Sequence, residues 1–317
     1  MGSLEQGRAV SGGTGHGIVV QEVGPRDGLQ NQATMLTVEQ KVELVERLVA
    51  AGLKRVEVGS FVHPKAVPQM ADTDAVFAAL NREARVVYSG LVLNERGFER
   101  AVAAGVQEIH FAFGVSETFN RQNQRATPEE SLAAFARLVP MAHGRGLRCT
   151  MTLATAFGCP FEGPVDPGRV VEWASRAVAT GMDEVVLADT IGVAVPTQVK
   201  ELVTRVRQEV DPDVPVGCHF HNTRNTGMAN VYAALEAGAT VFDASVGGLG
   251  GCPFAPGAAG NIATEDLVYM LSTMGIDTGV DLEAIIGVAR WLEEQLGYTL
   301  PGMVMKAGPF VPVAPGG

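Results

Sequence analysis

The segment Thr37-Val-Glu-Gln-Lys-Val-Glu-Leu-Val-Glu-Arg-Leu-Val-Ala-Ala-Gly-Leu-Lys-Arg-Val-Glu-Val58 reads as one complete helix, turn and strand. It opens with Thr37-Val-Glu-Gln40, the pattern of a capping box. Apolar residues then recur at helical spacing, at Val42, Leu44, Val45, Leu48 and Val49. Ala50-Ala-Gly52 ends the helix, because glycine accepts the backbone conformation that closes a last turn. The β-branched run from Arg55 predicts a strand.

The same helix ending recurs along the chain, at Ala103-Ala-Gly105, Ala179-Thr-Gly181 and Glu236-Ala-Gly238, each time shortly before an apolar run. Helical segments alternate with eight expected strands, at Ile18–Val23, Arg55–Val58, Val86–Leu91, Glu108–Phe113, Arg148–Ala154, Glu184–Ala188, Val214–Phe220 and Val241–Ser245. Eight such units over about 250 residues predict a (β/α)8 TIM barrel. A doubly wound sheet is the alternative, but no Gly-x-Gly-x-x-Gly follows the first strand.

Length and composition allow one α/β barrel or two smaller domains, since 317 residues with 46% hydrophobic content can bury a large core. We expect a disordered N-terminal lead at residues 1–17, the catalytic barrel at 18–278, and a C-terminal extension at 279–317. This extension would contain a helix, Leu282–Leu296, and a Pro/Gly-rich tail.

The charge and the cysteines indicate the setting. A net charge of -11 argues against a nucleic-acid partner. No apolar run reaches the roughly 18 residues of a membrane span, and the first residues lack the apolar core of a secretory signal. We therefore expect a cytoplasmic protein whose four cysteines, Cys149, Cys159, Cys218 and Cys252, are free thiols.

Two histidines close the seventh expected strand, in Val214-Pro-Val-Gly-Cys-His-Phe-His221. Alternation along a strand directs His219 and His221 to the same side. Asp27 follows the first strand, which neighbours the eighth in a closed barrel, and Asn261 could add a carbonyl oxygen. This donor set predicts a divalent metal site that suits Mg²⁺ or Mn²⁺, with Zn²⁺ or Co²⁺ as alternatives.

Further reactive side chains follow other strand ends. In a TIM barrel these ends meet at the active-site face. Each has a structural alternative: an exposed turn for Arg26 and Asp27, a helix cap for Asp189-Thr190, and a plain loop for the glycines before Cys252. Their common placement at one end of the barrel favours function.

Several long motifs closely resemble the 3-hydroxy-3-methylglutaryl-CoA lyases, a family of the metal-dependent lyase and Claisen-synthase barrels. The resemblance covers the chain from Ile18 to about Thr278. It rests on Glu22-Val-Gly-Pro-Arg-Asp-Gly-Leu-Gln-Asn31, Ser60-Phe-Val-His-Pro-Lys-Ala-Val-Pro-Gln-Met-Ala-Asp72, Gly158-Cys-Pro-Phe-Glu-Gly163, Asp189-Thr-Ile-Gly192, Gly248-Leu-Gly-Gly-Cys-Pro-Phe-Ala255 and Gly260-Asn-Ile-Ala-Thr-Glu-Asp-Leu-Val-Tyr-Met270.

The resemblance implies a carbon–carbon lyase that cleaves 3-hydroxy-3-methylglutaryl-CoA to acetyl-CoA and acetoacetate with a divalent metal. It implies Asp27, His219, His221 and Asn261 as metal ligands. Arg26 matches the arginine that stabilises the enolate, Glu57 and Asp189 its acidic supports, Glu22 an acid below the metal, and Cys252 the proposed general acid. Gln30 and Asn123 are candidates for binding the acyl-CoA. A homo-oligomer, a dimer or larger, is also implied.

Departures from the family pattern bear on the substrate. Asn222-Thr-Arg224-Asn225-Thr-Gly227 replaces the usual sequence after the metal histidines, and Arg224 adds a charge that could pair a carboxylate, contact the substrate or lie outside the pocket. Citramalyl-CoA or a longer 3-alkyl analogue is therefore an alternative substrate. A Claisen-type synthase is less favoured, because those enzymes usually carry additional C-terminal sequence. A catalytically silent CoA- or acid-binding protein is the alternative from another class, and metal-dependent turnover would separate it from an enzyme.

Overall fold

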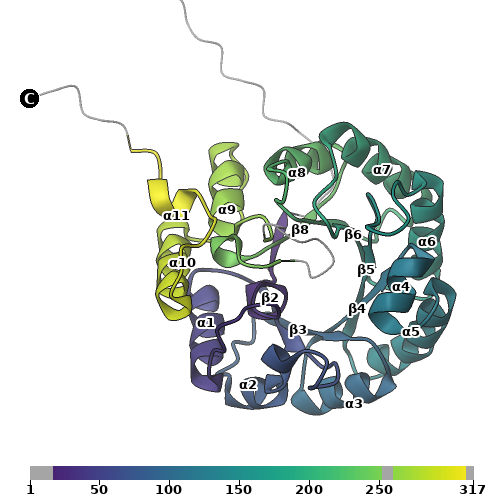
Figure 1. Cartoon of the computed structure of the whole chain (residues 1–317), viewed down its shortest axis with the longest axis horizontal. Coiled ribbons are helices and arrows are strands. Elements are labelled where there is room, and N and C mark those ends of the chain that lie inside the picture. Colours follow the sequence, from purple (N-terminus) through teal and green to yellow (C-terminus); the bar gives the residue numbers. More distant parts are fainter. Residues whose placement is uncertain (1–16, 252–259, 312–317) are drawn as a thin grey trace, which may run out of the picture.

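The computed structural model describes residues 17–251 and 260–311, and within them eight parallel strands close into a barrel (Figure 1). Each strand pairs with its neighbours in sequence, and β1 pairs with β8. The strands are β1 (Val19–Glu22), β2 (Arg55–Ser60), β3 (Val87–Val92), β4 (Glu108–Gly114), β5 (Arg148–Ala154), β6 (Glu184–Asp189), β7 (Val216–Phe220) and β8 (Val241–Ala244). The expected TIM barrel is confirmed.

Helices form the outer ring of the barrel (Figure 1). They are α1 (Val38–Ala50), α2 (Thr73–Ala79), α3 (Glu95–Ala104), α4 (Glu117–Gln124), α5 (Pro128–His143), α6 (Pro167–Ala179), α7 (Pro196–Glu209), α8 (Gly227–Glu236) and α9 (Thr264–Thr273). Three short helical turns, η1 (Gly24–Gly28), η2 (Pro68–Met70) and η3 (Val246–Gly248), lie in loops that follow strands. The capping box predicted at the start of α1 is present, since Thr37 Oγ1 accepts from Gln40 N and Gln40 Oε1 accepts from Thr37 N.

Strand alternation divides the side chains between two layers, as β4 illustrates. Ile109, Phe111 and Phe113 are fully buried, and the two phenylalanines face the helical ring. The Phe111 ring stacks on Phe135 of α5, and the Phe113 ring meets Trp173 of α6 edge-on. The intervening residues, Glu108 and His110, must therefore face the interior of the barrel.

A charge network fills the amino-terminal end of the interior, where aliphatic side chains are more usual. Arg55 Nη1 donates to Glu184 at 2.8 Å, and Arg55 Nη2 donates to both oxygens of Glu108 at 3.0 Å. Arg148 Nε also donates to Glu108, at 3.2 Å. This network closes the barrel below the active-site face.

The C-terminal extension packs beside the first barrel unit. Helix α10 (Leu282–Leu296) has the bounds expected from the sequence and lies between α9 and α1 (Figure 1). Gln40 of α1 bonds the side chain of Gln295, and the Arg47 guanidinium lies over the Trp291 ring. A short helix, α11 (Val304–Ala307), follows.

Some expectations fall on residues 1–16, 252–259 and 312–317, which lie outside the described residues. These are the N-terminal lead apart from Gly17, the end of the Pro/Gly-rich tail, and Cys252. In the part of the chain that is described, none of the helices combines the length and the apolar character needed to cross a membrane.

Candidate active site

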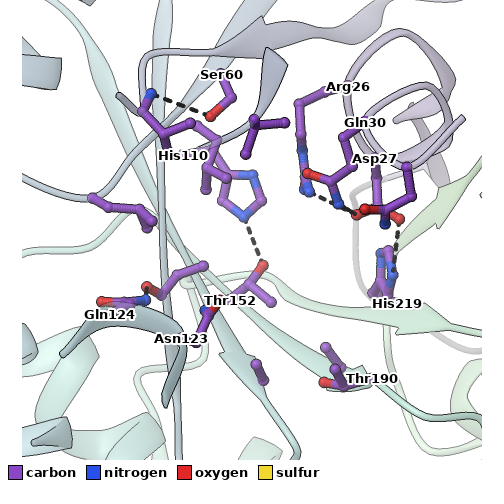
Figure 2. Close-up of a pocket in the computed structure, with 18 of the residues that line it drawn as sticks. Arg26, Asp27, Gln30, Ser60, His110, Asn123, Gln124, Thr152, Thr190 and His219 are labelled. Atoms are coloured by element: carbon purple, nitrogen blue, oxygen red, sulfur yellow. Dashed lines mark hydrogen bonds and ion pairs between the residues drawn. The ribbon is translucent and has the colours of Figure 1, made fainter. Parts of the chain in front are cut away.

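A pocket of about 430 Å³ opens at the carboxyl ends of the strands (Figure 2). Six of the residues predicted from the sequence line it: Arg26, Asp27, Gln30, Asn123, His219 and His221. Glu22, Glu57, Asp189 and Asn261 are buried around it. The pocket thus gathers residues from opposite ends of the sequence on the barrel face where TIM-barrel enzymes carry out their chemistry.

Asp27, His219 and His221 form a compact group of metal-ligating side chains. One ligand atom from each lies within 4.8 Å of the others, and all three residues are buried. Asp27 Oδ2 is 4.0 Å from His219 Nε2 and 3.7 Å from His221 Nε2. The predicted i, i+2 histidine pair therefore converges on one carboxylate, at distances that leave room for an ion between the donors.

A hydrogen bond to Asp243 fixes the orientation of the His219 ring. Its Nδ1 donates to Asp243 Oδ2 at 3.0 Å, and Asp243 pairs directly with His219 in the β7–β8 register. A hydrogen bond at one ring nitrogen leaves the other as the ligand, which is the usual arrangement of metal-binding histidines. Nε2, the remaining nitrogen, is the one that faces Asp27.

Three buried polar atoms of two residues beside Asp27 find no hydrogen-bond partner among the described residues. These are both ring nitrogens of His221 and the side-chain oxygen of Asn261. Unpartnered buried polar atoms carry a desolvation cost that an ion can offset. The Asn261 amide nitrogen donates to Asp27 Oδ2 at 2.9 Å, which keeps this residue beside the cluster. The donor set fits a bound divalent cation.

Asp27 is ionised. Burial alone would raise its pKa, but the charge of Arg26 and those of the two histidines outweigh burial and hold the pKa of Asp27 well below its usual range. Arg26 Nη1 and Gln30 Nε2 both donate to Asp27 Oδ1, at 2.7 and 2.8 Å. Oδ2 remains directed toward the histidines.

Arg26 is held between two carboxylates. Its Nε donates to Glu57 Oε2 at 2.7 Å, and the Glu57 side chain is completely buried. Burial pushes the pKa of Glu57 upward, but the charge of Arg26 and the hydrogen bonds from His110 and Arg26 keep it below the ordinary value. The guanidinium is thus anchored at Nε and Nη1 and still lines the pocket, with donors left over for a ligand.

Glu22 explains how the loop after β1 places Arg26 and Asp27. Its Oε1 accepts from the backbone N–H of Gly24 at 2.7 Å and of Val246 at 3.0 Å, and its Oε2 accepts from Thr264 Oγ1 at 2.6 Å. A Cβ at Gly24 would stand 2.5 Å from Glu22 Oε1, so this close approach requires glycine. Glu22 therefore fixes the turn η1 rather than contacting the pocket. Burial raises the pKa of Glu22 to about 7.

Asp189 also acts on a loop. Its two oxygens accept from the backbone N–H groups of Val193 and Ala194, at 2.9 and 3.0 Å. Its hydrogen bonds shape the turn that carries Thr190 into the pocket, whereas the carboxylates beside Arg26 are those of Glu57 and Asp27. Burial raises the pKa of Asp189.

Arg224 was expected to pair a carboxylate, to contact the substrate or to lie outside the pocket, and the structure places it outside the pocket. Its Nη1 donates to the carbonyl oxygens of Ile191 and Gly192, at 3.1 and 2.8 Å. The added charge therefore stabilises the β6–α7 loop rather than pairing a carboxylate.

The glycine-rich loop after β8 is shaped by close packing as far as it is described. Gly250 has a φ of 144°, and a Cβ there would stand 2.7 Å from the Asn261 amide nitrogen. Gly250 is thus required by geometry, whereas a Cβ at Gly251 would meet nothing within 4 Å. Gly251 lines the pocket, and Cys252 itself lies outside the described residues.

Several polar residues of the site were not predicted from the sequence, and three of them lie on the strands themselves. His110, Thr152 and Asp243 line the pocket from β4, β5 and β8. Each occupies an inward-facing position of an expected strand, which is a signal that the sequence contains. Which of these side chains meet in the pocket depends on the register between strands, and only the closed barrel supplies that register.

Comparison with known proteins places this site in a family. The sequence pattern of the HMGL-like family matches residues 18–292. An (R)-citramalyl-CoA lyase of Chloroflexus aurantiacus is 47% identical over 305 residues, covering 93% of this chain and 96% of the relative. A hydroxymethylglutaryl-CoA lyase of Bacillus subtilis is 42% identical over 284 residues, covering 90% and 95%.

Solved structures agree. An HMG-CoA lyase from Acinetobacter baumannii, in complex with coenzyme A and 3-methylmalate, superposes with a TM-score of 0.90 at 43% identity, covering 94% of this chain and 97% of that one. The carboxyl transferase domain of a Rhizobium etli pyruvate carboxylase, at 14% identity, shares the fold alone. The metal-ligating cluster, the arginine beside it and these matches together show that the chain belongs to the HMGL-like family and is a carbon–carbon lyase.

Proposed function

We propose that the protein cleaves 3-hydroxy-3-methylglutaryl-CoA to acetyl-CoA and acetoacetate. The observation that carries this proposal is the convergence of Asp27, His219 and His221 on one wall of the pocket with Arg26 beside them. Relatives that act on this acyl-CoA are about 40% identical over most of the chain, and one solved relative holds coenzyme A.

The reaction moves one proton and one electron pair. The tertiary hydroxyl loses its proton, its carbon–oxygen bond becomes the ketone of acetoacetate, and the neighbouring carbon–carbon bond breaks. That electron pair forms the enolate of acetyl-CoA, which takes up a proton at carbon. Arg26 faces the pocket with unused N–H donors, which suits it to stabilise the enolate oxygen that develops only in the transition state.

Asp27, His219, His221 and the Asn261 oxygen would hold the divalent ion. When bound there, Mg²⁺ or Mn²⁺ would supply Lewis-acid charge to the hydroxyl and carboxylate oxygens of the substrate. Mixed imidazole and oxygen ligands are compatible with Mn²⁺, whereas Mg²⁺ usually prefers more oxygen.

Cys252 is our candidate for the proton donor to the enolate. An ordinary thiol has a pKa of about 8.5 and is mostly protonated at neutral pH, as a donor must be. Its neighbour Gly251 lines the pocket and accepts a hydrogen bond from the Asn31 side chain. Gln30 and Asn123, on the pocket wall, are the candidates for binding the acyl-CoA.

Citramalyl-CoA is the second candidate substrate. The relative that is 47% identical to this chain is an (R)-citramalyl-CoA lyase, whereas the hydroxymethylglutaryl-CoA lyase of Bacillus subtilis is 42% identical. Citramalyl-CoA lacks one methylene between the carboxylate and the carbinol carbon. The same bond cleavage therefore gives pyruvate in place of acetoacetate.

The keto acid identifies the substrate. Protein with added Mn²⁺ is incubated separately with 3-hydroxy-3-methylglutaryl-CoA and with (R)-citramalyl-CoA, and the released acids are separated by chromatography. We expect acetoacetate from the first. Pyruvate from the second alone would move the function to citramalyl-CoA, and no keto acid from either would overturn both proposals.

We further propose a cytoplasmic homo-oligomer. Cys149, Cys159 and Cys218 are free and buried, which suits a reducing compartment. Cell fractionation tests the location, and light scattering coupled to size-exclusion chromatography tests the assembly. A monomeric mass would contradict the second statement.

A further inference from the structure

His110 stands in the pocket without a role in the chemistry described so far. It comes from the inward-facing side of β4, and its side chain is 10% exposed. The imidazole lies between Arg26 and Thr152 on the pocket wall (Figure 2). A histidine beside the arginine of a lyase site requires an explanation, because it could move a proton, bind the substrate or position a neighbour.

Both ring nitrogens of His110 are engaged. Nδ1 lies 2.5 Å from Glu57 Oε1, and Nε2 lies 2.7 Å from Thr152 Oγ1. An ionised Glu57 can only accept, so Nδ1 carries a proton and donates to it, while Nε2 shares a hydrogen bond with the threonine hydroxyl. The ring therefore bridges β2 and β5 across the interior of the barrel.

Glu57 connects this ring to Arg26. One of its oxygens contacts His110 and the other accepts from Arg26 Nε at 2.7 Å. Because the Glu57 side chain is completely buried, these two partners decide how its carboxylate plane is turned. The rotation of that plane in turn sets the direction of the Arg26 guanidinium.

We infer that His110 is a positioning residue, which acts through Glu57 to aim Arg26 at the reacting acyl group. The inference rests on the proposed function for its catalytic consequence. Its structural part, the control of Arg26 by His110, stands on the contacts alone. A misplacement of about 1 Å at a catalytic group can cost on the order of 100-fold in rate.

Two amide variants distinguish the role of the Nδ1 contact with Glu57 from that of the Nε2 contact with Thr152. In His110→Asn the amide nitrogen takes the place of Nδ1 and can still donate to Glu57, while the contact with Thr152 is lost. In His110→Gln the longer amide replaces Nε2 and reaches toward Thr152 instead. Neither side chain titrates, so a proton-carrying role would be lost equally in both.

With whichever acyl-CoA the wild type cleaves, we expect His110→Gln to lower kcat by about 10- to 100-fold at a nearly unchanged KM. His110→Asn should stay within a few-fold of the wild type and keep its pH profile. His143→Asn, on the outer helix α5, is the matched control and should leave both constants unchanged. If Asn and Gln lower kcat equally and a limb of the pH profile disappears, His110 moves a proton itself and the inference is wrong.

A double-mutant cycle tests the route through Arg26. In an Arg26→Lys background, His110→Gln should cause little further loss, since the group that it positions is already gone. If the fold losses in kcat of the two single variants multiply in the double variant, the inference is wrong.

Hydrogen exchange of the Arg26 side chain tests the control of Arg26 by His110 without any substrate. This test remains valid if neither acyl-CoA is cleaved. We expect the Arg26 Nε–H proton signal to be protected from exchange in the wild type and in His110→Asn. In His110→Gln it should exchange faster. Equal protection in all three proteins would show that His110 does not control Arg26, whatever the substrate is.

Discussion

Nδ1 of His219 donates a hydrogen bond of 3.0 Å to Oδ2 of Asp243, its direct neighbour across the β7–β8 pair. This contact selects Nε2 as the nitrogen directed toward Asp27 and adds negative charge behind the imidazole. It makes Asp243 part of the metal site although it is not among the proposed ligands.

Replacing Asp243 by Asn should weaken metal binding without unfolding the barrel. Removing a residue that hydrogen-bonds to a metal ligand usually lowers metal affinity about 10- to 100-fold, and we expect a loss of about that size. Titration with Mn²⁺, followed by electron paramagnetic resonance, measures it. Asp74→Asn, which changes an exposed carboxylate paired with Arg100 of α3, is the control. Equal affinities in both variants would exclude Asp243 from the metal site.

Arg26→Lys should keep metal binding and most of the substrate binding while turnover falls by about 100- to 1,000-fold. A lysine cannot reproduce the planar fork that binds Glu57 and Asp27 together. Steady-state kinetics then separate a fall in kcat from a rise in KM. Turnover close to that of the wild type would remove Arg26 from the mechanism.

The raised pKa of Glu265 should make the free energy of unfolding depend on pH. Burial raises its pKa to about 8, and one of its carboxylate oxygens has no hydrogen-bond partner in the described part of the chain. Because the folded-state pKa lies above the unfolded one, its contribution to stability is complete below pH 4.5 and is lost as the pH rises toward 8.

Glu265→Gln should therefore leave the free energy of unfolding nearly unchanged at pH 4.5 and raise it by a few kcal/mol above pH 8, relative to the wild type. Urea unfolding at the two pH values checks this. Glu283→Gln, in the first turn of α10, provides a control on another helix. A benefit of equal size at both pH values would contradict the assignment.

Arg224→Ala tests the placement of this residue outside the pocket. Its hydrogen bonds go to loop carbonyls, so we expect kcat and KM within about twofold of the wild type and a stability loss of about 1 kcal/mol. Michaelis–Menten kinetics with both acyl-CoAs and thermal melting measure the two effects. A large change in KM for either substrate would mean that Arg224 contacts the acyl group after all.

The barrel could be predicted from the sequence because its signals are local. The capping box at Thr37, helix-ending glycines such as Gly105 and β-branched runs are each read within about ten residues. The boundaries of all eight strands accordingly lie within two residues of the expected ones. The histidine pair was predictable for the same reason, since its spacing is a property of one strand.

The inner network was less accessible to sequence reasoning. Glu22 and Asp189 were expected to support the chemistry at the metal and the arginine. Sequence does not reveal that Glu22 Oε1 and both oxygens of Asp189 accept from loop N–H groups and that Glu22 Oε2 accepts from the Thr264 hydroxyl. His110 depends on how β4 is aligned against β2 and β5 across the interior. That alignment follows from the closure of the whole barrel, in which no single segment dictates the outcome.

The most direct test of the account is acetyl-CoA release by metal-stripped protein, measured before and after Mn²⁺ is added, with the wild type and Asp27→Asn in parallel. We predict that the stripped wild type releases almost none, that Mn²⁺ restores cleavage of 3-hydroxy-3-methylglutaryl-CoA or (R)-citramalyl-CoA, and that Asp27→Asn is not restored at the same metal concentration. Release at the full rate without metal, or equal restoration of Asp27→Asn, would contradict a metal-dependent lyase centred on Asp27, His219 and His221.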